Sequence, residues 1–289
     1  RNTAVGNSAL QTQNFTSATN AYNSAFGFNA GGAVTTGLRN TLIGAKTGDT
    51  ITTGGDNVAV GANALTATTT ASNNTAVGSS ALTANTTGAN NVSVGFDALR
   101  ENTTGASNSA LGLYSLLTNT TGGSNVAVGT SALYANTTAS NNTAVGYRAG
   151  TTTTTGADNV AVGSDALFAN TTGASNVAIG HDALGENTTG DNNTAYGFAA
   201  ADTNTTGLGN TIIGGHCDVT AADTNYAHAL GYNLSCAAGY TTLGTSASDI
   251  RAAHGVATWA AVSDQRYKKD IVDSTAGLSF INALQPRTF

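Results

Sequence analysis

The chain has 289 residues, of which only 9% are charged, and a formal net charge of −6. So few basic residues exclude the positive surface that nucleic-acid binding requires. No apolar run reaches the roughly 20 residues of a membrane-spanning helix, so membrane insertion is not expected. The two cysteines, Cys217 and Cys236, exclude the disulfide framework typical of small secreted domains.

A glycine that follows a large apolar residue returns every 17 residues through most of the chain. We call these the anchor glycines: Gly27, Gly44, Gly61, Gly78, Gly95, Gly112, Gly129, Gly146, Gly163, Gly180, Gly197, Gly214 and Gly231. Gly6 and Gly244 extend the series at irregular spacing. A strict period of this size indicates one coil per repeat in a stacked solenoid. Residues 1–244 are therefore predicted to form a β-roll shaft, whose regular part is about 58 Å long at about 4.8 Å per coil.

Each repeat is predicted to contain two short strands, joined by a bend at the glycine and closed by an Asn-Thr-Thr-Gly turn. Short apolar segments bounded by Gly and Asn are typical of strands and turns. The residue before the anchor glycine and a leucine four residues after it are predicted to form the core: Val77, Val94, Val128, Val145, Val162, Leu82, Leu133 and Leu167. The prediction is an all-β fold, a parallel β-roll or β-solenoid.

An asparagine recurs four residues before the anchor glycine, and we call it the corner asparagine. Examples are Asn74, Asn91, Asn108, Asn125, Asn142, Asn159 and Asn176. Stacked amides can form a hydrogen-bonded ladder, and Asn tolerates the left-handed conformation that a corner needs. A structural ladder is therefore predicted, and a row of ligand-binding amides is the alternative.

Two large apolar residues per coil make a thin core for a single chain. Three chains around a shared axis would bury both, which predicts an intertwined homotrimer. Small residues before the valine, such as Ala76, Ala127 and Ala161, would allow close approach at that axis. The Asn-x-(Ala/Val)-(Val/Ile)-Gly pattern of residues 1–244 resembles the head domains of trimeric autotransporter adhesins, although 17 residues exceeds their usual repeat length. This resemblance implies a left-handed parallel β-roll trimer.

Residues that could carry chemistry are scattered along the repeats. His216, Cys217 and Asp218 are adjacent and could seed a metal site, but no metal or other cofactor is expected. The repeated Asp97, Asp165 and Asp182 are expected on a solvated face. Threonine rows such as the one containing 137–138 could form a flat array like that of ice-binding solenoids, but a polar turn is the favoured interpretation.

The composition changes after residue 244. Residues 245–289 contain five basic and four acidic residues, together with the single Trp and the single Pro of the chain. A domain boundary is therefore placed near 245–262, with 245–262 as a neck or tip. The chain begins at Arg1 and contains no Met, which predicts a piece of a longer or processed protein.

The sequence Ser263-Asp264-Gln265-Arg266-Tyr267-Lys268-Lys269-Asp270-Ile271 resembles the opening of the intramolecular chaperone auto-processing domain, which ends many bacteriophage tail fibres and endosialidase tail spikes. Each fixed residue of the Ser-Asp-x-Arg-x-Lys-x-x-Ile pattern is present. The resemblance implies that residues 263–289 begin such a domain with a short helix. It also implies a self-cleaving dyad, with Ser263 as nucleophile, Lys268 as base, and Asp264 as a helix cap or orienting group.

These features predict a structural and host-attachment fibre of a phage tail, or of a related injection machine, located extracellularly in the virion. Its partners would be two further copies of itself, other tail proteins, and a glycan or protein receptor on the host surface. It is not expected to be an enzyme, apart from single-turnover autoproteolysis beside Ser263. The alternatives are a trimeric adhesin on the bacterial surface and, less favoured, a glycan-degrading tail spike.

Overall fold

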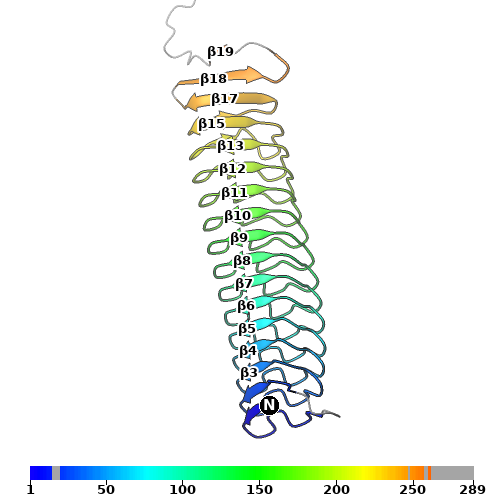
Figure 1. The fold of residues 1–289 in the computed structure, drawn as a ribbon. Coiled ribbons are helices and arrows are strands. Elements are labelled where there is room, and N and C mark those ends of the chain that lie inside the picture. Colours follow the sequence, from blue (N-terminus) through cyan, green and yellow to red (C-terminus); the bar gives the residue numbers. More distant parts are fainter. Residues whose placement is uncertain (15–19, 247, 257–259, 262–289) are drawn as a thin grey trace, which may run out of the picture.

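The structure, a computed structural model, describes residues 1–14, 20–246, 248–256 and 260–261. These residues form a rod in which each coil lies on the one before it (Figure 1). Every regular element among them is a β-strand, and none is a helix. The prediction of an all-β parallel solenoid with a 17-residue repeat is confirmed.

Each coil contributes one short strand, formed by the three residues before its glycine. The first thirteen are β1 (Thr3–Val5), β2 (Ser24–Phe26), β3 (Thr41–Ile43), β4 (Val58–Val60), β5 (Thr75–Val77), β6 (Val92–Val94), β7 (Ser109–Leu111), β8 (Val126–Val128), β9 (Thr143–Val145), β10 (Val160–Val162), β11 (Val177–Ile179), β12 (Thr194–Tyr196) and β13 (Thr211–Ile213). Each strand pairs in parallel with the next, so that Ala127 of β8 lies beside Ala144 of β9.

The segment after the anchor glycine is a series of turns, so the prediction of a second strand in each repeat is wrong. In the coil of Gly129, for example, Ser131 has a φ of 56° and Leu133 a φ of 50°. The left-handed conformation costs a residue with a side chain about 1–2 kcal/mol. Burying a leucine contributes about 1.5–3 kcal/mol. Leu133 is fully enclosed, and its burial therefore offsets its strained backbone.

The anchor glycine has a backbone conformation that other residues rarely adopt. Its φ lies between 127° and 159° in all thirteen regular coils. A Cβ atom at Gly78 would overlap the backbone carbonyl of Gly95 in the next coil. Successive coils can therefore stack this closely only if the residue at this position is glycine, which explains why the spacing never slips.

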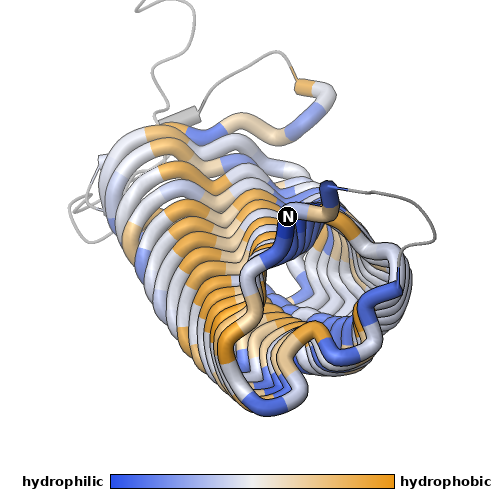
Figure 2. The backbone as a smooth tube through the Cα atoms, turned by 60° about the horizontal axis from the view of Figure 1, so that its bottom comes forward, coloured by the Kyte–Doolittle hydropathy of each residue, from blue (hydrophilic) through white to orange (hydrophobic). Residues whose placement is uncertain are grey.

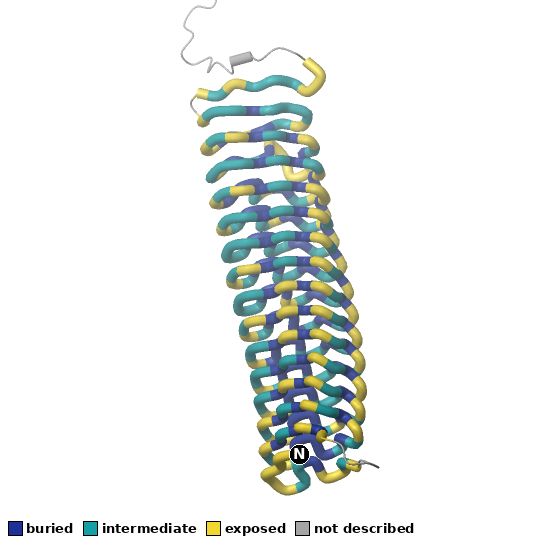
Figure 3. The backbone as a smooth tube through the Cα atoms, in the orientation of Figure 1, coloured by how far each residue is buried: buried dark blue, intermediate teal, exposed yellow. Residues whose placement is uncertain are grey.

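The interior of each coil is filled by the middle residue of the strand and by an alanine and a leucine after the glycine. Ala76, Ala81 and Leu82 are fully buried in this way. The same buried positions repeat along the rod in Figure 3. Leu133 and Leu167, also predicted as core, are buried as well.

The valines predicted as core lie elsewhere in the chain that the structure describes. Val77, Val94, Val128, Val145 and Val162 are partly or largely exposed on the outer side of the coil, and Val145 is 37% exposed. Side chains alternate along a strand, so only the middle residue of a three-residue strand points inward. Alanine occupies that position, and placing these valines in the core of the coil was therefore wrong.

Both irregular ends of the repeat series keep the parallel register. β1 pairs with β2, and β15 (His228–Tyr232) pairs with β17 (Tyr240–Thr245), so that Gly231 lies opposite Gly244. Two short strands, β14 (Asp218–Val219) and β16 (Ser235–Cys236), form a separate parallel pair.

Beyond Thr245 the pairing becomes antiparallel. β18 (Ser248–Ala253) folds back on β17, and β19 (Ala260–Ala261) pairs with β18. This change falls beside the boundary predicted near residue 245. The predicted chaperone start at 263–289, with Ser263, Asp264 and Lys268, lies outside the described residues.

Candidate functional site

The corner asparagines are stacked inside the rod. The backbone N–H of each donates to Oδ1 of the corner asparagine one coil earlier, as from Asn74 to Asn57 at 3.0 Å. The side-chain amide donates to a backbone carbonyl of the next coil, as from Asn74 to Gly88 at 3.0 Å. The predicted residues Asn74, Asn91, Asn108, Asn125, Asn142, Asn159 and Asn176 are at most 3% exposed. In these described coils the amides therefore bond to the rod itself, and a ligand outside it would not reach them.

A second buried ladder was missed in the sequence. It is formed by the asparagine seven residues after the anchor glycine, which we call the turn asparagine: Asn85, Asn102, Asn119, Asn136, Asn170, Asn187 and Asn204. Nδ2 of Asn102 donates to Oδ1 of Asn85 at 2.9 Å and to the carbonyl of Gly105 at 2.9 Å. The signal was the recurrence of Asn in the Asn-Thr-Thr-Gly run. Because these asparagines are buried, the Asn-x-Thr triplets they begin are inaccessible to glycosylation.

The turn ladder is interrupted in one coil. Thr153 stands where the asparagine would be, and its buried hydroxyl has no hydrogen-bond partner. Oδ1 of Asn136 in the preceding coil is buried without a partner as well. In the coils of Gly27 and Gly44, by contrast, Val34 and Ile51 occupy this position and are fully buried.

Exposed apolar residues occupy three positions of the coil: the first and third residues of the strand and the residue after its glycine. We call these positions the strand face. Its exposed large residues are Val5, Phe26, Phe28, Ile43, Val58, Val92, Phe96, Leu111, Leu113, Val126, Val145, Tyr147, Tyr196, Phe198, Leu230 and Tyr232. Hydrophobic residues form columns along the rod in Figure 2. From β1 to β15, the strand face contains no Asp, Glu, Lys or Arg.

Aromatic and histidine rings stack along the C-terminal part of the strand face. His181 and Phe198 have ring centroids 5.2 Å apart with nearly parallel planes. His216 lies 5.0 Å from Phe198 and 6.0 Å from Tyr232. These rings face one another from coil to coil, so much of their flat surface is already covered.

An acidic groove of about 390 Å³ lies beside these rings. It is lined by Arg148, Asp165, Phe168, Asp182, Gly185, Glu186 and Asp202. Arg148 is the one basic residue among them: its Nε lies 2.7 Å from Oδ1 of Asp165 and its guanidinium 4.8 Å from the centre of the Phe168 ring. The lining therefore has an excess of negative charge.

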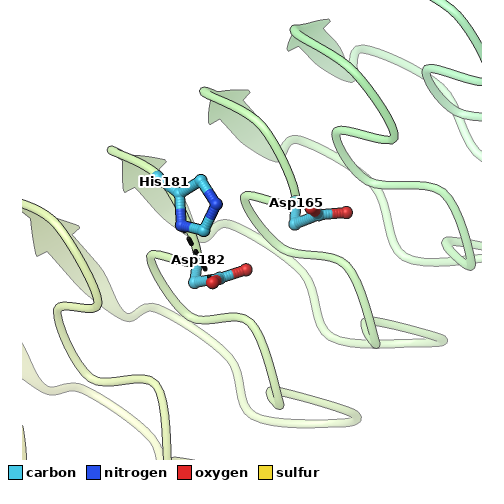
Figure 4. Close-up of side chains that lie close together, drawn as sticks. All are labelled: Asp165, His181 and Asp182. Carbon is cyan, nitrogen blue, oxygen red and sulfur yellow. Dashed lines mark ion pairs between the residues drawn. The ribbon is translucent and has the colours of Figure 1, made fainter.

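Three side chains at the edge of this groove have the donor atoms of a cation site (Figure 4). Donor atoms of Asp165, His181 and Asp182 all lie within 4.8 Å of one another. Nδ1 of His181 lies 2.9 Å from Oδ2 of Asp182, while Asp165 is paired with Arg148. A divalent cation would thus have to compete with contacts that the chain already makes.

The carboxyl of Asp202 is held partly protonated. Burial raises its pKa to about 6, and the negative charge of Asp218 and a hydrogen bond to it contribute further. Asp218 in turn accepts a hydrogen bond from the Thr203 hydroxyl at 2.7 Å. The groove therefore combines ionised carboxylates with one carboxyl that can carry a proton near neutral pH.

The three adjacent residues considered for a metal do not converge. His216 is exposed on the strand face, Cys217 is buried, and Asp218 is bonded to Thr203. The proposed dyad, Ser263 and Lys268, lies outside the described residues.

Within the described part of the chain, no helix could cross a lipid bilayer. Comparison of the chain with protein-family models, with curated proteins and with solved structures finds no match in any of the three.

Proposed function

We propose that this chain is the shaft of a host-attachment fibre of a phage tail or a related injection machine, and that it works as a homotrimer. The observation that carries the proposal is a rod of stacked coils followed by the Ser263–Ile271 sequence. A rod is suited to holding a binding end at a distance from the body that carries it. The ligand would be a glycan or a protein on the host surface.

The strand face supports association between copies of the chain. Each coil encloses its own leucine, so the interior alone does not call for partners. The uncharged outer face does: monomeric proteins rarely expose contiguous apolar patches of more than a few hundred Å². Fourteen parallel pairings of about 4.8 Å and a width of about 16 Å give roughly 1,000 Å² per chain. A standard interface buries about 800 Å² per partner.

A second copy is the partner whose features repeat at the same axial spacing. The valine and isoleucine columns advance by one coil per repeat, and another rod of this sequence presents the same columns at the same intervals. Three rods would cover these columns in a shared apolar core, with the acidic groove outside. The valines predicted as core would then be buried between chains and not within one chain.

The C-terminal sequence suggests how such a trimer finds its register. Columns that repeat every coil can pair one coil out of step at little cost. A C-terminal chaperone domain that assembles first would align the three chains before the shafts pack. Cleavage beside Ser263 would then remove the aligning domain and leave a rod that unfolds slowly.

Native mass spectrometry of the assembled chain tests the proposal. The expected mass is three times 28.5 kDa. A soluble, folded monomer at micromolar concentration would contradict it. A bacterial surface adhesin is the second candidate, because the same roll resembles adhesin heads; a membrane-anchor domain encoded downstream, in place of a chaperone domain, would favour it.

A further inference from the structure

The C-terminal end of the parallel stack is closed by the hairpin of β17 and β18, and two histidines meet there. His228 is the first residue of β15, and His254 follows directly after β18. Their ring centroids lie 4.9 Å apart. Since β17 lies between β15 and β18, His254 reaches across a whole strand to contact His228.

Further contacts fix His254 in this position. Its backbone N–H donates to the carbonyl of Gly239 at 2.8 Å. Its Nε2 lies 3.2 Å from the hydroxyl of Thr241, the β17 residue that stands directly beside His228. The ring is therefore held over the outer side of β17 by one polar contact and one ring contact.

The surroundings of the pair contain little that could neutralise a second positive charge. Strand β13 contributes Thr211 beside His228 and no charged residue. On β17 the titratable residue is Tyr240, and on β16 it is Cys236, whose thiol contacts the His228 carbonyl. β19 has none.

Strand β18 contributes the charged residues nearest to the pair in sequence. Asp249 lies opposite Gly244, and Arg251 lies opposite Thr242, which is buried. Neither forms an ion pair with the histidines in the described part of the chain. Burial, followed by the neighbouring His254, lowers the pKa of His228 below its ordinary value.

We propose that His228 and His254 form a pH-sensitive clasp that holds the end of β18 against the parallel stack at neutral pH and releases it in acid. Two neutral rings pack against each other, whereas two imidazolium rings at the same distance repel. A histidine whose pKa is lowered by folding stabilises the closed state fully above the ordinary value near 6.5. That stability is lost as the pH falls through the lowered value. The clasp is independent of the proposed function.

Hydrogen exchange of the full chain at pH 7.5 and 5.0 tests the clasp, with rates corrected for the pH dependence of the exchange chemistry. The protection of Ser248–Ala253 is expected to fall about ten-fold or more at pH 5.0, because local opening governs exchange at such sites. Protection of β8, in the middle of the rod, should not change. Unchanged protection of β18 in the wild-type chain would overturn the proposal.

His254→Gln and His228→Gln remove one charge each while keeping a polar side chain. Either substitution should make the protection of β18 the same at both pH values, whether it stays high or becomes low. His216→Gln is the matched control, because His216 is exposed on the strand face, away from the clasp, and should leave the acid response intact. A fall in protection that persists in both clasp variants would assign the response to another group and overturn the proposal.

Discussion

At the scale of single residues, the backbone of the next coil determines which side chain is allowed at the anchor position. A Cβ atom there would overlap a carbonyl group that belongs to the following coil. The glycine is thus required by a contact 17 residues away as much as by its own φ. The same coil geometry places a leucine in a left-handed conformation and compensates for it by burial.

Gly214→Ala should destabilise the rod strongly. The new methyl group would overlap the carbonyl of Gly231, at a φ of 127° that alanine rarely adopts. We expect a loss of more than about 3 kcal/mol, measured by thermal or denaturant unfolding. The adjacent Gly215→Ala is the control, because a Cβ there meets only the Tyr232 ring at an ordinary 3.7 Å. Equal effects of the two substitutions would contradict this account.

Thr153→Asn should stabilise the rod. The new Nδ2 would donate to Oδ1 of Asn136, which now lacks a partner, and its own Oδ1 could accept from Asn170 in the next coil. Two or three added hydrogen bonds give about 1–2 kcal/mol. Thr155→Asn, at an exposed position of the same turn, should change the melting temperature little. A lower melting temperature for Thr153→Asn would show that the coil cannot accommodate the amide.

The carboxyl of Asp202 should make the rod less stable above about pH 6. Its raised pKa means that the folded state favours the protonated form, so its contribution is fully present below the ordinary value of 3.8 and is lost as the pH rises through about 6. Asp202→Asn should therefore stabilise the rod at pH 8 and have no effect at pH 4. The gain stays below about 1 kcal/mol, because the group is largely open to solvent. Melting curves at the two pH values would reveal an opposite trend.

At the scale of the coil, one strand and a chain of turns divide the apolar residues between two sides. The strand places alanine inside and valine outside, and the turns place leucine inside. The coil therefore has an interior of its own and an apolar exterior. A substitution on one side should act on the folding of the chain, and one on the other side on its association.

Leu133→Ala and Val128→Asp distinguish the two sides. Leu133→Ala should cost about 2–5 kcal/mol of folding stability, because it leaves a cavity in a closed coil. Val128→Asp should leave the circular dichroism spectrum of the chain unchanged and prevent the trimer, since it buries a carboxylate between chains. Unfolding experiments and native mass spectrometry give the two readouts. A Val128→Asp chain that still forms trimers would show that the strand face is not the interface.

The sequence predicts the period and the parallel stacking because both follow from exact repetition. It does not reveal which side of Val-Ala-Val faces inward, since the pattern is compatible with either side. Val128 was therefore placed inside, although Ala127 is the residue that fits there. The second strand was predicted because Leu133 is apolar and flanked by small residues. Only the closed coil shows that a leucine with a positive φ is enclosed well enough to be stable.

The candidate site was less predictable than the fold. Arg148, Asp165 and Asp202 come from different coils, and their convergence depends on how far each turn projects from the rod. The pairing of His228 with His254 depends on an antiparallel return after Thr245, which interrupts the repeat. Neither arrangement follows from residue spacing, because the spacing is regular only where the side chains are equivalent.

At the scale of the whole molecule, the rod and the C-terminal sequence are expected to act in succession. In the full-length protein, the wild-type chain should separate into two pieces cut beside Ser263. Ser263→Ala should give one uncut chain that still assembles, and Lys268→Ala should also block the cut because the hydroxyl loses its base. Lys269→Ala, a change to the neighbouring lysine, should be cut normally. A denaturing gel with mass spectrometry of the fragments decides, and cleavage of Ser263→Ala would exclude the serine mechanism.

The hydrogen bonds of the regular coils run between residues in adjacent coils, many of them 17 positions apart. A duplication or deletion of 17 codons would therefore add or remove one coil and leave every other coil with equivalent neighbours. Unequal recombination within the gene could change the reach of the molecule in steps of about 4.8 Å without a new folding problem at each step. Reach becomes a trait that can vary by copy number, separately from the changes at the end that binds.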